Sequence, residues 1–213
     1  MIKKLSKKAS LLSALVLTMA LFAGCSNEKE NQKVADIEVK TIATKELQDK
    51  LSDDSWVVVD TRINDAFNGW KLDEVERGGH IKGAVDFSAN WLTVDSKDKE
   101  KTLDKALETK GIEKDKNIML YDANGKDAKE VANYLSEKGY KNLYTYNVAD
   151  WAKDESLPME SYENYEMIVP ATIVNDILDG KKPETFENSK NIKIVEASWG
   201  EESEAYSKGH VPT

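Results

Sequence analysis

The stretch from Trp56 to Ala84 constrains the fold of this chain more than any other. It opens with an apolar run, Trp56-Val57-Val58-Val59, which leads into Asp60-Thr61-Arg62, and it closes with Gly78-Gly79-His80-Ile81-Lys82-Gly83-Ala84. Four bulky apolar residues, three of them β-branched, are typical of a strand buried on both faces, as in a parallel sheet. Charged residues directly after such a strand lie at its carboxyl end, where open α/β sheets place their ligands. The glycines around the histidine indicate a turn into a further short strand, residues 84–87.

Strand and helix patterns alternate from residue 39 to residue 153. Strands are expected at residues 39–42, 56–59, 84–87, 117–121 and 140–146, and a turn is expected at residues 150–151. Thr44 is expected to be the N-cap of a helix that ends near residue 51. Two further helices are indicated by apolar faces, made of Leu103, Ala106 and Leu107 and of Ala128, Val131, Ala132 and Leu135. This alternation predicts an α/β domain, an open parallel sheet with helices on both faces.

Two motifs of this domain resemble those of the rhodanese family of sulfurtransferase domains. The first is D-x-R at residues 60–62 followed by G-H-I-x-G-A at residues 79–84. The second is the strand, loop and helix at residues 118–135. In active rhodaneses a cysteine follows that strand, and the loop N–H groups and the helix amino end stabilise its thiolate or persulfide. The alternative is any parallel α/β domain with a polar turn after its central strand.

Asp122 stands where the resemblance places the nucleophilic cysteine. The active-site-like loop comprises Asp122, Ala123, Asn124, Gly125, Lys126 and Asp127, with the glycine permitting the bend. A carboxylate can neither form a persulfide nor carry sulfane sulfur, and active members often have arginine at the far end of the loop, where this chain has lysine. The resemblance therefore implies an inactive domain, as is common for the first domain of tandem rhodaneses. We expect Asp122 to cap exposed N–H groups of the following helix, with acid–base catalysis as the alternative.

The polar residues of the first motif are interpreted as structural. Asp60 and Arg62 are expected to form a pair beneath the loop rather than to react. His80 is a possible ligand or base, but a histidine in a glycine turn more often hydrogen-bonds the backbone. No nearby group of Cys, His and carboxylate residues has the spacing of a metal site, so no metal ligand is predicted. The family resemblance implies no cofactor.

The amino terminus has the pattern of a lipoprotein signal peptide. Four lysines precede an apolar run, residues 11–23, which is shorter than a typical membrane span. Residues 21–25, Leu-Phe-Ala-Gly-Cys, resemble the lipobox of bacterial lipoproteins, which implies lipidation of Cys25; an ordinary secretory signal is the alternative. Residues 1–24 are assigned to the signal peptide and residues 25–38 to a flexible polar tether. The resemblance implies a chain anchored by lipid to the bacterial cell membrane, facing outside the cytoplasm.

Cysteine usage and charge exclude several functions. Cys25 is the only cysteine, so the chain has no internal disulfide and no thiol for catalysis once lipid is attached. The 30 basic residues less the four signal lysines leave 26 against 39 acidic residues, a net charge of −13. Such a polyanion is not expected to bind nucleic acid or to lie flat on an anionic membrane. Any membrane attachment is expected to come from the lipid.

The pattern of the first domain begins again after residue 164. Residues 154–164 are acidic and aperiodic and are interpreted as a linker. A strand at residues 165–169 and a helix ending at Gly180 repeat the plan of residues 39–51, and residues 192–199 resemble the central strand. Gly209-His210-Val211 then repeats the histidine turn, 130 residues after His80. Residues 165–213 are predicted to be the truncated start of a second rhodanese-like domain; a carboxyl-terminal extension packed on the first domain is the alternative.

The expected function follows from the family resemblance. The chain looks like the amino-terminal part of a lipid-anchored tandem rhodanese, which moves sulfane sulfur from thiosulfate or 3-mercaptopyruvate to a thiol or cyanide. Residues 39–153 form its non-catalytic first domain, and the nucleophilic cysteine is expected beyond residue 213. A catalytically inactive rhodanese-like binding or regulatory module at the cell surface is the alternative. A solute-binding lipoprotein is a third possibility, but it does not explain the repeated motifs.

Overall fold

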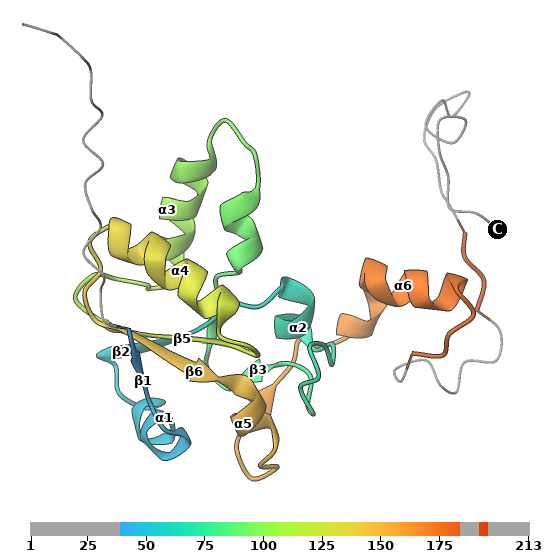
Figure 1. The fold of residues 1–213 in the computed structure, drawn as a ribbon, viewed down its shortest axis with the longest axis horizontal. Helices are drawn as coiled ribbons and strands as arrows, with labels where there is room; N and C mark the ends of the chain where they lie inside the picture. Colours follow the sequence, from blue (N-terminus) through green and yellow to red (C-terminus); the bar gives the residue numbers. More distant parts are fainter. Residues whose placement is uncertain (1–38, 184–191, 196–213) are drawn as a thin grey trace, which may run out of the picture. The chain divides into compact units, whose positions relative to one another are not determined.

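The computed structural model describes residues 39–183 and 192–195 (Figure 1). The predicted α/β class is confirmed, because these residues form a five-stranded sheet in which all pairs are parallel. The order across the sheet is β1 (Lys40–Thr41), β6 (Leu143–Asn147), β5 (Asn117–Asp122), β2 (Trp56–Asp60) and β4 (Val85–Asp86). Among the described residues, no helix is both long and apolar enough to cross a membrane.

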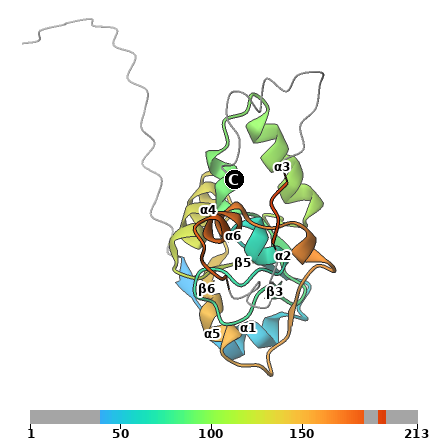
Figure 2. The same ribbon diagram turned by 90° about the vertical axis from the view of Figure 1, so that its right-hand side faces the viewer.

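Helices cover both faces of the sheet, as predicted. On one face lie α3 (Lys99–Thr109), α4 (Lys126–Glu137) and the short 3₁₀ helix η1 (Ala89–Thr93); on the other lie α1 (Thr44–Lys50) and α5 (Val148–Ala152) (Figures 1 and 2). The four apolar residues predicted for the buried face of α4 are all fully buried. Side chains alternate along β2, so that Val57 and Val59 pack toward α3 and α4 while Val58 packs toward α1.

The strand register brings the predicted polar residues to one edge of the sheet. Asp60, at the end of β2, is opposite Tyr121 of β5, and Asp122 is opposite Asn147 of β6. The N–H of Thr61 continues the ladder by donating to the Tyr121 carbonyl at 3.0 Å. Because all these strands run in the same direction, their carboxyl ends meet here, which is the edge that carries ligands in open α/β sheets.

The segment predicted as a linker, residues 154–164, is joined to the first domain. Within it, β7 (Met159–Glu160) pairs antiparallel with β3 (His80–Ile81) to make a second, two-stranded sheet. The N–H of Tyr162 donates to the carbonyl of Asn68 in α2 (Asn64–Asn68) at 2.8 Å. The ordered unit therefore continues past residue 153.

Two local predictions in the first domain are wrong. Thr44 is the first residue of α1 rather than its N-cap, which is Ala43; its hydroxyl instead lies 2.8 Å from the Tyr146 hydroxyl. Residues 150–151, predicted as a turn, lie within the short helix α5. In both places a contact with the sheet outweighs the local sequence preference.

The predicted second domain copy is not shown by the described residues. The helix is present as α6 (Ala171–Leu178), but residues 165–167 form a 3₁₀ turn, η2 (Tyr165–Met167), instead of a strand. Residues 192–195 are exposed and form no strand. The rest of the predicted second central strand lies outside the described residues, as do His210 and Cys25.

Candidate functional site

A tight loop connects β5 to α4 at the carboxyl edge of the sheet. It consists of Ala123, Asn124 and Gly125, and the last of these has a φ of +80° at the N-cap position of the helix. Only glycine adopts this left-handed conformation without strain. A Cβ at this position would meet no atom within 4 Å, so the requirement is conformational rather than steric. The bend expected from the sequence is present.

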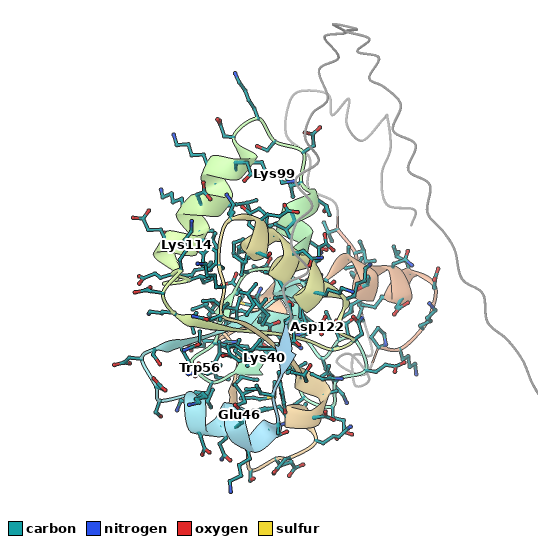
Figure 3. The ribbon with its side chains drawn as sticks, turned by 60° about the vertical axis from the view of Figure 1, so that its left-hand side comes forward. Lys40, Glu46, Trp56, Lys99, Lys114 and Asp122 are labelled. Atoms are coloured by element: carbon teal, nitrogen blue, oxygen red, sulfur yellow. The ribbon has the colours of Figure 1, made fainter. Side chains whose placement is uncertain are left out.

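The side chain of Asp122 fills the space enclosed by this loop. Its Oδ1 accepts the N–H of Gly125 at 2.6 Å and its Oδ2 accepts the N–H of Ala128 at 3.1 Å. Only 1% of Asp122 is exposed. Figure 3 shows this residue at one end of the sheet and Trp56 at the other end. The carboxylate thus satisfies N–H groups at the amino end of α4, where the helix dipole favours negative charge. An anion from solution would compete with this side chain for the same donors.

The rest of the loop is more exposed and carries further charge. Asn124 and Lys126 are exposed, and the Lys126 N–H donates to Oδ1 of Asn124 at 3.0 Å. Asp127 is half-buried, and its pKa is raised, chiefly by burial and next by the negative charge of Asp122, while Lys126 opposes the shift. The loop therefore surrounds its N–H donors with carboxylates, an arrangement that disfavours an incoming anion.

Asp60 and Arg62 form a buried pair next to this loop. The guanidinium Nε lies 3.0 Å from Asp60 Oδ1, and its Nη2 donates to Asp60 Oδ2 at 2.6 Å and to the Gly79 carbonyl at 2.7 Å. Burial acts to lower the pKa of Arg62, but the hydrogen bond and charge of Asp60 outweigh it, so that pKa is raised. The guanidinium also lies 5.7 Å from the centroid of the Tyr121 ring. The pair thus connects β2 to the glycine turn before β3.

Tyr121 continues this connection to β3. Its hydroxyl accepts the N–H of Ile81 at 3.1 Å, and the ring is fully buried. Burial raises the pKa of Tyr121 well above its ordinary value, so the phenol stays protonated at physiological pH.

His80 faces the segment that contains β7 rather than the loop after β5. Its Nδ1 donates to the carbonyl of Phe67 at 2.8 Å, and the two rings stack with centroids 3.8 Å apart. Its Nε2 lies 3.5 Å from Oε1 of Glu160. The histidine therefore hydrogen-bonds the backbone and faces a carboxylate, and no group of three His, Cys, Asp or Glu residues in the described part of the chain is arranged to hold a metal ion.

Arg77 is a key residue of this region that was not singled out from the sequence. Its guanidinium donates four hydrogen bonds of 2.8–2.9 Å to backbone carbonyls, those of Trp151, Ala152, Asp154 and Leu157. One side chain thus hydrogen-bonds the carbonyl groups at the carboxyl end of α5 and those of the segment that leads into β7. Carbonyl partners leave no signal in a sequence, although an arginine directly before Gly78-Gly79 was the available hint.

The arrangement combines two backbone N–H donors, those of Gly125 and Ala128, which together we call the cradle, with a side chain that cannot carry sulfur. The structure brings together Asp122, Asp60 and Arg62 at the carboxyl edge of the sheet. The described residues contain no thiol that could be positioned at this loop.

Comparisons with known proteins agree with this fold. A rhodanese-like domain matches residues 43–152, which is 110 of the 213 residues. No curated protein matches the chain. Among solved structures, the anaerobic ergothioneine biosynthesis enzyme from Chlorobium limicola, in complex with its natural substrate trimethyl histidine, is 30% identical with a TM-score of 0.62. That match covers 68% of this chain and 33% of the enzyme.

Two structures of the enzyme EanB match a larger part of the chain. Wild-type EanB and a variant with ergothioneine covalently linked to a cysteine persulfide are each 27% identical, with TM-scores of 0.68. Both matches cover 82% of this chain and 39–40% of the solved structure. The chain thus spans about a third to two fifths of the length of the structures it matches. Because the matched domain covers more than half of the sequence, the chain belongs to the family of proteins with a rhodanese-like domain.

Proposed function

We propose that this chain is the amino-terminal part of a tandem sulfurtransferase whose first domain, residues 39–153, is non-catalytic. The observation that supports the proposal most is that the Asp122 carboxylate accepts the N–H groups of Gly125 and Ala128, which would stabilise a persulfide if a cysteine stood at this position. A carboxylate has no sulfur atom to accept sulfane sulfur. The reacting cysteine is therefore supplied by another domain, beyond residue 213. The role of the first domain in this proposal is structural.

The substrates and the setting are part of the same proposal. The donor is thiosulfate or 3-mercaptopyruvate and the acceptor is a thiol or cyanide, without metal or cofactor. The matched EanB structures, which include a persulfide linked to ergothioneine, support sulfur transfer within this family. The lipobox-like residues 21–25 support lipidation of Cys25, attachment to the outer side of the bacterial cell membrane and a tether over residues 25–38. The partial repeat of motifs at residues 165–213 supports a second domain.

Two measurements test this function. Purified protein incubated with thiosulfate and cyanide is expected to form no thiocyanate above the protein-free rate. Sequencing the gene past codon 213 is expected to continue the reading frame into a strand, a cysteine and a glycine-containing loop. Thiocyanate formation by the present chain would overturn the assignment of a non-catalytic first domain.

An immediate stop codon would favour the second candidate, a binding or regulatory module at the cell surface. The observation that favours this candidate is that the loop after β5 is folded around the Asp122 carboxylate, which cannot carry sulfur. The two candidates differ in whether any downstream domain carries a cysteine.

A further inference from the structure

The loop between β5 and α4 contains one of the two Asn-Gly pairs in the chain, Asn124–Gly125; the other is Asn68–Gly69. In an Asn-Gly pair the backbone nitrogen of the glycine reaches the side-chain amide carbon of the asparagine with the least hindrance, because glycine lacks a Cβ. Bond formation between these atoms gives a five-membered succinimide ring and releases ammonia. Whether a folded protein promotes this reaction depends on the groups around the nitrogen and the amide.

Two groups at Asn124 are positioned to promote it. The attacking nitrogen, that of Gly125, donates its N–H to Oδ1 of Asp122 at 2.6 Å, so a carboxylate base faces the proton that must leave. The amide oxygen under attack, Oδ1 of Asn124, accepts the Lys126 N–H at 3.0 Å, so a donor faces the oxygen on which negative charge develops. The base is held in place because its second oxygen accepts the Ala128 N–H.

We infer that Asn124 is a site of self-catalysed deamidation. The Gly125 nitrogen gives its proton to Asp122 and bonds to Cγ of Asn124. The Cγ–Nδ2 bond then breaks, and Nδ2 leaves as ammonia with the proton that Asp122 passes on. The succinimide takes up one water and opens to aspartate or isoaspartate. Atoms balance without an oxidant or reductant, and Asp122 is regenerated.

The product changes the loop that resembles an active site. Either product adds one negative charge beside Asp122 and Asp127, at an edge that already disfavours anions. Isoaspartate also inserts a carbon into the main chain directly before Gly125, which disturbs the hydrogen bond that this residue donates to Asp122.

The second pair, Asn68–Gly69, provides a control within the same molecule. Here the glycine N–H donates to the carbonyl of Asp65, a neutral acceptor, at 3.3 Å at the end of α2. The side chain of Tyr165 covers the glycine, since a Cβ there would lie 2.4 Å from the ring. The hydrogen bond that the Gly69 nitrogen donates thus goes to a neutral carbonyl and not to a carboxylate base. We therefore expect the folded state to slow the deamidation of Asn68.

The test compares both pairs in the folded and the unfolded protein. The purified protein is incubated at neutral pH in native buffer and in concentrated urea, and succinimide and isoaspartate at residues 68 and 124 are quantified by peptide mass spectrometry. In urea the two pairs are expected to react at similar rates. In native buffer Asn124 is expected to react at least ~10-fold faster than in urea, a threshold set below the ~10²–10⁴-fold that is typical of general-base catalysis. Asn68 is expected to react more slowly in native buffer than in urea. A native rate at Asn124 equal to or below its rate in urea overturns the inference.

Two variants identify the base. Asp122→Asn is expected to slow the reaction at Asn124 at least ~10-fold without changing Asn68, since the amide cannot accept the proton. Asn124→Gln is expected to abolish the product at residue 124. An unchanged rate in Asp122→Asn overturns the role of that carboxylate. If this variant does not fold, the comparison of native and urea-unfolded wild-type protein decides alone.

Discussion

Replacing Arg77 by alanine is expected to loosen the segment that leads into β7 and to lower the stability of the whole domain. The side chain donates four hydrogen bonds of 2.8–2.9 Å, of which three are partly buried and one is exposed. A hydrogen bond contributes about 0.5–1.5 kcal/mol net, and more when the donor is charged, while the exposed carbonyl regains water. We therefore expect a loss of about 3–4 kcal/mol in the free energy of unfolding.

Urea unfolding followed by tryptophan fluorescence measures this loss, because Trp151 lies at one of the affected carbonyls. For a chain of this size the expected fall in Tm is about 6–16 °C. Arg77→Lys is expected to recover less than half of the loss, since a single ammonium cannot reach four carbonyls. Lys82→Ala, an exposed substitution in the same stretch, serves as the control and is expected to change stability by less than about 0.5 kcal/mol. A loss in Arg77→Ala no larger than that of this control would refute the reasoning.

Three further predictions concern the carboxyl edge of the sheet and its glycines. Asp60→Asn leaves a buried guanidinium without its charged partner and should cost about 3–5 kcal/mol in urea unfolding; a loss below 1 kcal/mol would show that the pair is not needed. The pKa of Asp127 is raised by burial and by the charge of Asp122, so the stability that this group contributes is lost as the pH rises from the ordinary pKa of an aspartate through the pKa of Asp127 in the folded state. NMR titration should show a lower pKa of Asp127 in the Asp122→Asn variant. An unchanged pKa would exclude the electrostatic coupling. Gly125→Ala, which has open space, should cost only the ~1–2 kcal/mol of left-handed strain. Gly79→Ala should cost ~1–3 kcal/mol more, because its Cβ would lie 2.3 Å from a backbone oxygen, and equal losses in thermal unfolding would contradict this difference.

The sheet and its main helices were predictable because their residues follow simple periods. Two examples are the apolar run Trp56–Val59 in β2 and the apolar residues from Ala128 to Leu135 in α4. In each, the spacing of apolar residues along a single strand or helix indicates which side of that element is buried. The bend at Gly125 was predictable for the same reason, since a glycine between a strand and a helix marks a turn.

The missed features depend on contacts between distant residues. Met159 and Glu160 pair with a strand of only two residues, so they show no alternation and were interpreted as linker. Thr44 has the residue type of an N-cap, but Tyr146, about 100 positions later, engages its hydroxyl. Arg77 acts through carbonyl groups, which every residue has, so its role became visible only in the structure.

Sulfur loading of the Asp122→Cys variant tests most directly whether this loop is an intact rhodanese cradle that a carboxylate occupies. The variant places a thiol where the N–H groups of Gly125 and Ala128 now bind the carboxylate, and these donors stabilise a thiolate or persulfide. The measurement is the intact mass of the folded variant after incubation with thiosulfate, with Cys25 replaced by serine in both the variant and its wild-type control. We predict a gain of one sulfur atom in the variant and none in the control. A folded variant that gains no sulfur would contradict the placement of the cradle at this loop.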